Sequence, residues 1–379
     1  MSGKHEMPKK RRNNEKMESR NIREGNVKVR KMERPRKEKT GRRGLKIFGR
    51  IVLTLVIILV ILVGIIVAFI GSKLGKMQQV ELDETDLGIS SQVEENLSEY
   101  RNIALFGVDS RDSSLGEGNR SDCIIIASLN NKTKEVKLIS VYRDTYVNIE
   151  GHGLDKITHA YSYGGAALAV KTLNENFDLN ITEFATVNFD SVAEAVNALG
   201  GVTINVTNEE LNYINNYIDE TSRVTGITSK RVTSAGKQKL DGVQAVAYSR
   251  IRYTSGGDYK RTERMRTVIE AMIEKFKTKN ISEMNQIIDQ ILPEVYTNIT
   301  SGDIFSLIPS VASLKVTDSI GWPYETKGIT LDRWYGVPVT LESNVKQLHQ
   351  EAFGEPDYVP SDRVKEISNK IIQKTGYTN

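Results

Sequence analysis

Arginines and aspartates recur in short clusters over residues 101–264 of this chain. The clusters are Asp109, Arg120-Ser121-Asp122, Arg143-Asp144, Arg250-Ile251-Arg252 and Arg261-Thr262-Glu263-Arg264. Guanidinium groups bind phosphate oxygens in a bidentate manner, and carboxylates hold the divalent cation that often accompanies phosphate. The combination of the two residue types indicates a binding site for a pyrophosphate.

The aspartates lie where a sheet would bring them together. Asp109 and Arg143 each follow an apolar run that predicts a strand, and Asp122 opens the run between them. Sites in open α/β sheets form at the carboxyl ends of strands. If the middle strand is antiparallel to its neighbours, Asp122 emerges at the same edge as Asp109. Two carboxylates there could hold Mg²⁺, with phosphate oxygens and water completing the octahedron.

The remaining arginines form two pairs. Arg250 and Arg252 are two residues apart at the end of a predicted strand, so we expect them to share a face. Arg261 and Arg264 are three apart at the start of a predicted helix, which also predicts a shared face. A single arginine of this kind is usually solvated and paired with a carboxylate. For the whole set, in an otherwise acidic domain, an anion site is the better interpretation.

The segments that carry these clusters alternate between strand and helix patterns. Short apolar runs bounded by Gly, Asp or Asn predict strands, and apolar residues at three- and four-residue spacing predict helices. The predicted strands are 102–108, 123–129, 135–141, 202–206 and 244–251, and the predicted helices are 166–173, 191–198, 262–277 and 361–374. Such an alternation is typical of an α/β domain with a mixed sheet covered on both faces.

Charge separates an N-terminal tail from the rest of the chain. Residues 1–50 contain 19 of the 52 lysines and arginines but only 6 of the 48 acidic residues, although the net charge of the whole chain is only +4. A segment so rich in charge and poor in apolar residues is predicted to be disordered. We expect residues 1–46 to form a basic tail that touches lipid headgroups rather than nucleic acid.

An uncharged segment of 21 residues, 51–71, follows the tail. As a helix it would span roughly 30 Å, the thickness of a bilayer core. A cleaved signal peptide is the competing interpretation, but its apolar stretch would be shorter and a cleavage site would follow. We therefore predict a transmembrane helix over 47–72. The basic residues before it place the tail in the cytoplasm and the remainder of the chain outside the cell.

The external part is predicted to contain a polar stalk at 73–98, a catalytic domain at 99–310 and a C-terminal extension at 311–379 that packs on it. The single cysteine, Cys123, excludes an intrachain disulfide, which fits a Gram-positive surface protein. Its neighbours predict a buried, unreactive thiol. His159 lies between apolar residues and is interpreted as structural. Walker loops, Gly-x-Ser-x-Gly elbows and Cys/His metal spacings are absent from the sequence.

These clusters, in this order and behind one apolar segment, resemble the LytR-CpsA-Psr family of bacterial cell-wall enzymes. The resemblance covers roughly residues 99–275. It rests on 102–109, 120–122, 140–144, 156–165, 199–202, 240–242, 250–252 and 257–264. It implies a three-layer α/β/α domain with a long hydrophobic pocket for a lipid. It also implies a phosphotransferase that attaches wall teichoic acid, capsule or another secondary polysaccharide from an undecaprenyl-pyrophosphate carrier to peptidoglycan.

The resemblance assigns roles to individual residues. It implies that Asp109 and Asp122 ligate Mg²⁺. It implies that the pyrophosphate is held by Arg120, Arg143, Arg250, Arg252 and Arg261, with Arg264 as a further contact in the same motif. Together the two aspartates and the first five of these arginines form the predicted catalytic set. The sequence departs from the family pattern at three places: Tyr142 replaces a proline, Met265 replaces a glutamine, and an aspartate is shifted to Asn197-Ala198.

The mechanism predicted from this set is a metal-assisted phosphotransfer. A muramic-acid hydroxyl would attack the phosphorus next to the sugar, polyprenyl phosphate would leave, and Asp109 or Asp122 would take the proton. Arginines and Mg²⁺ would neutralise the charge that develops on the oxygens. Two alternatives remain at this point. The chain could hydrolyse polyprenyl pyrophosphate with water in place of the sugar hydroxyl, or it could be a non-enzymatic envelope regulator that signals through its tail.

Overall fold

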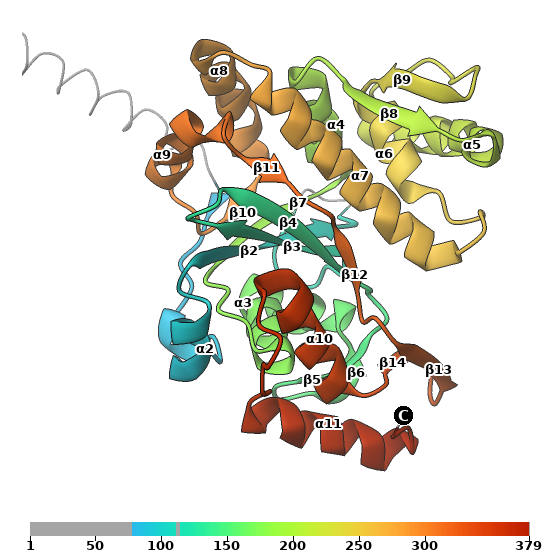
Figure 1. Cartoon of the computed structure of the whole chain (residues 1–379). Helices are drawn as coiled ribbons and strands as arrows, with labels where there is room; N and C mark the ends of the chain where they lie inside the picture. Colours follow the sequence, from blue (N-terminus) through green and yellow to red (C-terminus); the bar gives the residue numbers. More distant parts are fainter. Residues whose placement is uncertain (1–77, 111–113, 379) are drawn as a thin grey trace, which may run out of the picture. The chain divides into compact units, whose positions relative to one another are not determined.

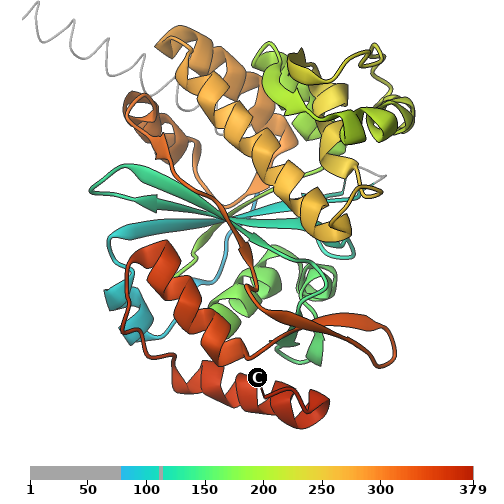
Figure 2. The ribbon, with the colours of Figure 1, turned by 45° about the vertical axis from the view of Figure 1, so that its right-hand side comes forward.

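A computed structural model of the chain describes residues 78–110 and 114–378. In this part of the chain a mixed sheet lies between two groups of helices, as Figure 1 and Figure 2 show from two directions. The predicted α/β fold with helices on both faces of a mixed sheet is confirmed. The predicted tail at 1–46 and the predicted transmembrane helix at 47–72 lie outside the described residues. Within the described ranges, every helix is too short or too polar to cross a bilayer.

The central sheet brings several strand ends to one edge. Its order is β1-β10-β7-β2-β3-β4-β11, and β12 also pairs with β4. The bounds are β1 Gln78–Gln79, β2 Tyr100–Val108, β3 Ser121–Asn130, β4 Glu135–Val141, β7 Glu183–Val187, β10 Tyr296–Thr297, β11 Lys315–Val316 and β12 Ile320–Trp322. Strand β3 is antiparallel to both β2 and β4, whereas β2 and β7 are parallel. The carboxyl ends of β2, β4 and β7 therefore meet the start of β3.

One face of the sheet is covered by the largest apolar core of the described residues. Helices α2, α3, α10 and α11 contribute to it, together with the hairpins β5–β6 and β13–β14. Their bounds are α2 Ser91–Asn96, α3 Thr158–Phe177, α10 Leu341–Phe353, α11 Asp362–Thr375, β5 Tyr146–Ile149, β6 Gly153–Lys156, β13 Thr326–Thr330 and β14 Trp334–Pro338. Phe106 of β2, Phe177 of α3 and Trp322 of β12 are fully buried there.

Both segments predicted to flank the catalytic domain are parts of this core. Leu87, Val93 and Leu97 lie in the predicted stalk, and all three are buried. The sequence is polar because few of its residues face the core: residues 84–86 form an exposed short helix, and the helix at 91–96 buries only Val93. The predicted extension supplies β11 and β12 to the sheet and two helices to the core. The described residues 78–98 are therefore not a stalk, and residues 311–378 are integral to the fold.

The other face of the sheet carries a second group of elements, drawn in yellow-green to orange in Figure 1. They are α4 Phe189–Ala198, β8 Val202–Val206, α5 Asn208–Thr225, β9 Gly236–Leu240, α6 Gly242–Arg250, α7 Gly257–Lys277, α8 Ile281–Ile291 and α9 Ser301–Val311. Helices α4 to α7 and the β8–β9 hairpin share a core of their own. Helix α7 joins this core to the sheet, because Met265 packs with Ile125 and Leu138.

The prediction of a strand at 244–251 is wrong, because this segment is the helix α6. Asp241 caps its start, accepting a hydrogen bond from the backbone of Gln244, whose side chain accepts one in return from the backbone of Asp241. Nearly all of α6 is buried, so its sequence is apolar on every side and has no helical stripe. Gly242 permits close packing, since a Cβ there would lie 2.0 Å from the carbonyl oxygen of Ala193 in α4.

Candidate active site

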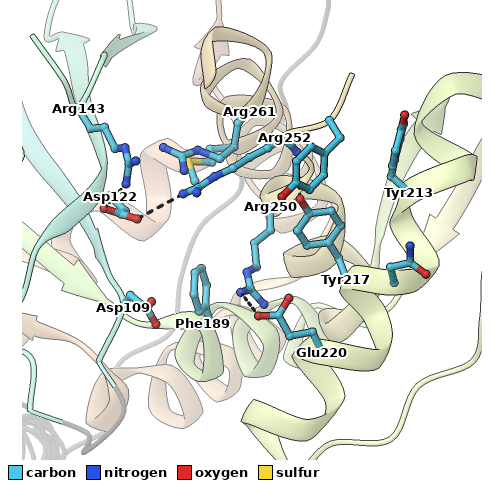
Figure 3. A pocket seen from close by; sticks show the side chains of 13 residues that line it. Asp109, Asp122, Arg143, Phe189, Tyr213, Tyr217, Glu220, Arg250, Arg252 and Arg261 are labelled. Atoms are coloured by element: carbon cyan, nitrogen blue, oxygen red, sulfur yellow. Dashed lines mark hydrogen bonds and ion pairs between the residues drawn. The ribbon is translucent and has the colours of Figure 1, made fainter. Parts of the chain in front are cut away.

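An open cavity of about 480 Å³ lies at the sheet edge where β2 and β4 end and β3 begins. Four of the predicted arginines and both predicted metal ligands line it, and Figure 3 shows them facing a common space. They are Arg143, Arg250, Arg252, Arg261, Asp109 and Asp122. The sequence places these residues up to 152 positions apart, from 109 to 261. The structure thus brings these six residues together at one cavity.

Each charged group reaches the cavity from a different element. Asp109 follows β2, Asp122 lies in β3, and Arg143 follows β4 after one residue. The expected antiparallel β3 is confirmed, and it brings the two aspartates to one edge. Arg250 is the last residue of α6 and Arg252 lies in the loop beyond it, so their common direction comes from a helix end rather than a strand. Arg261 projects from the second turn of α7.

Asp122 links two of the arginines. Its Oδ1 accepts a hydrogen bond from Nη1 of Arg143 at 2.8 Å, and its Oδ2 lies 3.6 Å from Nη2 of Arg252. Burial by itself would lower the pKa of Arg143, but Asp122, Asp144 and Asp258 together raise it. The arginine is therefore a permanent cation held in place by carboxylates.

Arg250 is held from the opposite wall. Its Nη2 donates to Oε1 of Glu220 at 2.9 Å, and its Nη1 donates to Oγ1 of Thr221 at 3.1 Å. The guanidinium carbon also lies 4.6 Å from the ring centre of Phe189, a cation–π geometry. Helices α4, α5 and α6 thus fix the position of this side chain. Figure 3 shows the Arg250–Glu220 pair at the lower wall of the cavity.

Arg261 is an unusual cation, because its side chain is only 2% exposed. Its Nη2 donates to Oδ2 of Asp258 at 3.0 Å, but its Nε is buried without a hydrogen-bond acceptor among the described residues. Burial lowers the pKa of Arg261, Asp258 opposes that shift, and the nearby Arg252 and Arg143 lower the pKa further. A buried guanidinium with a free donor beside two like charges is a strong attractor for an anion.

The two carboxylates suit a small hard cation. Mg²⁺ is usually held by one or two carboxylates, with phosphate oxygens and water as the other ligands. Asp109 is exposed at the cavity, and Asp122 faces the same space. Among the described residues, groups of three or more possible metal ligands are absent. The donor set therefore fits a metal that arrives with a phosphate ligand rather than one enclosed by protein.

Two predicted pyrophosphate ligands lie elsewhere. Arg120 is exposed, just before β3, and does not line the cavity. Arg264 is buried, and its guanidinium donates to Glu210 at 2.7 Å, to the carbonyl of Ile251 at 3.0 Å and to Thr254 at 2.6 Å. It ties α7 to α5 and to the loop that follows α6. The structure therefore gives Arg264 a structural place behind the site and does not bring it together with Arg261.

A second, apolar cavity of about 330 Å³ continues from the first. Asp122, Phe189 and Met265 line both cavities. Strands β2, β3 and β7 form its floor, and helices α4, α6 and α7 cover it. Most of the apolar stripe predicted in α7 lines this space, namely Met265, Val268, Ile269, Met272 and Ile273. Met265, which departs from the family pattern, thus lies where the charged cavity becomes apolar.

Cys123 lines the apolar cavity beside Gly107. A Cβ atom at position 107 would lie only 2.8 Å from the Cβ atom of Cys123. Cys123 is half-buried rather than fully buried. Desolvation raises the pKa of its thiol to about 12, so it forms part of the apolar wall as an unreactive side chain. His159 is also structural in its contacts, with Nδ1 2.8 Å from Oδ2 of Asp155.

One wall of the charged cavity was missed by the sequence analysis. Tyr213, Asn216, Tyr217 and Glu220 line it from α5. Their spacing of three and four residues places them on one helical face. The capping box formed by Thr207 and Glu210 marks the start of this helix and could have revealed it.

The LytR_cpsA_psr family model matches residues 68–347. The chain belongs to the LytR_cpsA_psr family. The matched range extends beyond both predicted ends of the catalytic domain, in agreement with the shared core described above.

Named relatives include two transferases. The polyisoprenyl-teichoic acid–peptidoglycan teichoic acid transferase TagU of Enterococcus faecalis is 34% identical over 265 residues, which cover 69% of this chain and 82% of TagU. The transferase of the same description named TagT, from Bacillus subtilis, is 35% identical over 234 residues, which cover 60% of this chain and 70% of TagT.

Solved structures of the family have the same fold. TagT bound to LI-WTA has a TM-score of 0.54 at 26% identity, covering 79% of this chain and 100% of that one. A structure of TagT with bound octaprenyl pyrophosphate lipid has a TM-score of 0.51 at 25% identity, with the same coverage of both chains.

Proposed function

We propose that this family member transfers a glycopolymer, of the teichoic-acid type or a related polysaccharide, from an undecaprenyl-pyrophosphate carrier to peptidoglycan. The observation that carries the proposal is the junction of two cavities at Asp122, Phe189 and Met265. One cavity presents four guanidiniums and the other presents an apolar wall. A lipid pyrophosphate has the same two parts in the same order. The names of the relatives and the lipid bound to TagT support the same class of substrate.

In the proposed mechanism the prenyl chain lies beneath α7, and its pyrophosphate lies among Arg143, Arg250, Arg252 and Arg261. A muramic-acid hydroxyl oxygen attacks the phosphorus next to the sugar and forms the new P–O bond. The P–O bond to the polyprenyl phosphate breaks, and that phosphate leaves. The hydroxyl proton passes to Asp109 or Asp122. The arginines neutralise charge that increases on the equatorial and bridging oxygens in the transition state.

Asp109 and Asp122 would hold Mg²⁺ together with the pyrophosphate. The ion would supply Lewis-acid stabilisation of the phosphate oxygens. Because Asp122 is also bound to Arg143 and Arg252, it orients the arginines whether or not the cation is present. We further propose that residues 47–72 anchor the chain in the cell membrane, with the tail in the cytoplasm and the catalytic domain outside.

The test is a transfer assay with a polyprenyl-pyrophosphate-linked glycan, peptidoglycan and Mg²⁺. The proposal predicts glycan attached to peptidoglycan and free polyprenyl phosphate. The double variant Arg250→Ala/Arg252→Ala should lose transfer by at least about a hundredfold, because it removes two charge-assisted contacts to the phosphates. Full activity of that variant contradicts the assignment. Equal release of polyprenyl phosphate with and without peptidoglycan would show hydrolysis instead.

A further inference from the structure

A pair of tyrosines joins the end of β4 to the start of α7, just outside the charged cavity. Tyr142 follows β4 directly, and Tyr259 lies in the first turn of α7. Their ring centres are 4.5 Å apart with an interplanar angle of 85°, which is an edge-to-face contact. Neither residue lines the charged or the apolar cavity. Each nevertheless stands close in sequence to an arginine of the site, Tyr142 before Arg143 and Tyr259 before Arg261.

Both tyrosines are held by contacts beyond their own pair. The backbone N–H of Tyr142 donates to the carbonyl of Trp322 in β12 at 3.0 Å. Its ring lies against Gly321, where a Cβ would be 2.1 Å from the Tyr142 hydroxyl oxygen, so a larger residue at 321 would displace the ring. The hydroxyl of Tyr259 lies 3.1 Å from Oγ1 of Thr326, the first residue of β13. The pair therefore links α7 to β4, β12 and β13.

The first turn of α7 has no side-chain cap of its own. Its N-cap residue is Gly256, and both Gly256 and Gly257 have a positive φ. Helices α5, α6 and α8, by contrast, begin with capping boxes. An uncapped start leaves backbone N–H groups without a side-chain acceptor, and two glycines do not fix the direction of the chain that enters the helix. Contacts with neighbouring elements must therefore hold this turn in place.

Like charges work against the position of this turn. Burial lowers the pKa of Arg261, and the nearby Arg252 and Arg143 lower it further, so these cations repel one another when no anion is bound. Figure 3 shows the guanidiniums of Arg143 and Arg261 beside one another near Asp122. Asp258 attracts both, at 3.0 Å from Arg261 and 3.9 Å from Arg143, but its side chain is 37% exposed and water screens the attraction. An uncharged contact is needed to keep the two arginines close.

We propose that Tyr142 and Tyr259 are positioning residues, whose contact holds the first turn of α7 against β4 so that Arg143 and Arg261 are in place before a pyrophosphate arrives. The inference rests on the proposed function, because it takes pyrophosphate as the ligand of these arginines. Without the pair, the turn would be in its binding position for only part of the time, and affinity would fall by that fraction. Because Tyr142 stands where the family pattern has a proline, a relative with that proline must hold the turn by other contacts.

The first test measures the affinity of the full chain in detergent for inorganic pyrophosphate with Mg²⁺. Tyr142→Ala and Tyr259→Ala should each lower the affinity about threefold to tenfold, the worth of one aromatic pair. The double alanine variant should be about as weak as the weaker single variant, because either change removes the same contact. Tyr142→Phe/Tyr259→Phe keeps both rings and should bind within about twofold of the wild type.

Hydrogen exchange separates positioning from a general loss of stability. In Tyr259→Ala the amides of residues 260–263 should exchange faster than in the wild type when no ligand is present. Saturating pyrophosphate should restore their protection, because the ligand then holds the turn. The matched control is Tyr100→Ala, which removes an edge-to-face contact with Phe353, ring centres 5.0 Å apart, in the core on the other face of the sheet. Its affinity for pyrophosphate should equal that of the wild type.

Three results would overturn the inference. They are unchanged affinity in both single alanine variants, losses that multiply in the double variant, and faster exchange that pyrophosphate does not reverse. Failure of the proposed function would differ from all three, because wild-type protein itself would then show no affinity for pyrophosphate.

Discussion

Arg261 and Arg264 lie one helical turn apart on α7 but have opposite surroundings. Arg261 faces the cavity with a buried Nε that has no acceptor within the described ranges, beside two other cations. Arg264 has a carboxylate, a carbonyl and a hydroxyl as acceptors. We infer that the first is placed for a ligand at the expense of stability, whereas the second stabilises the fold.

For Arg261→Met we expect separate effects on stability and on activity. The free energy of unfolding should be unchanged or higher, since a buried charge is removed and its partner Asp258 remains partly exposed to water. Transfer should fall at least about tenfold because a phosphate contact is lost. Denaturant unfolding without lipid, together with the transfer assay, measures both. A large loss of stability would show that Arg261 is structural.

Arg264→Met is the matched change three residues further along the helix. It leaves the buried carboxylate of Glu210 without its cation, so we expect a loss of about 3 to 5 kcal/mol in the free energy of unfolding. Lipid affinity of the fraction that remains folded should be close to that of the wild type. Unfolding by urea checks the first expectation and lipid titration below the transition checks the second. An Arg264→Met protein of normal stability with no lipid affinity would reverse the two roles.

At the scale of elements, one part of the apolar stripe of α7 packs against the sheet, and another part lines the apolar cavity. Met265 contacts the sheet, and Val268, Ile269, Met272 and Ile273 line the space between α7 and the strands below it. The sequence predicted this stripe but could not distinguish a packed core from a cavity wall. Periodicity records which side of a helix is apolar, and the space between that side and its neighbours depends on tertiary packing.

Ala195→Phe should fill part of the apolar cavity from α4. Ala195 lines that space and is almost fully buried, so a benzyl group there occupies volume that the prenyl chain would need. We expect affinity for a polyprenyl pyrophosphate to fall at least about tenfold, while affinity for inorganic pyrophosphate is retained. Competition binding with the two ligands measures the difference. Normal affinity for the long-chain lipid would mean that the chain binds elsewhere.

The helix α6 shows why one element was misjudged. Its sequence is buried on every side, and a short apolar run without a stripe predicts a strand as readily as a helix. The Asp241 and Gln244 capping box was the signal that distinguished the two. The sequence nevertheless predicted that Arg250 and Arg252 face the same side. Both residues lie at the end of this segment, whether it is a strand or a helix.

For the molecule as a whole, the sequence predicted the strands β2, β3 and β4 and the edge where their charged residues lie, but not the order of the sheet or the part that residues 78–98 and 311–378 play in the core. The clusters at strand ends predicted the edge where Asp109, Asp122 and Arg143 meet. The segment at 78–98 was judged by its polar composition, which conceals the few residues that it buries, and residues 311–378 were set apart because they lie outside the resemblance to the family. Their contributions to the core come from pairing with β4 and from packing against α3, contacts over long sequence separations that local patterns do not record.

A chain that ends at residue 310 should therefore fail to fold. It lacks β11 and β12 beside β4 and loses α10 and α11 from the main core. We expect an insoluble product, or one without a cooperative thermal transition. A chain that ends at Gly376 keeps both helices and is the control. A soluble, cooperatively folded product ending at 310 would contradict the view that the C-terminal region is integral.

The most direct measurement is a crystal structure of the protein with a short polyprenyl pyrophosphate and Mg²⁺. We predict phosphate oxygens within hydrogen-bonding distance of Arg250, Arg252 and Arg261, the metal beside Asp109 and Asp122, and the prenyl chain beneath α7. A pyrophosphate bound away from these arginines, or a chain that lies outside the apolar cavity, would contradict the account.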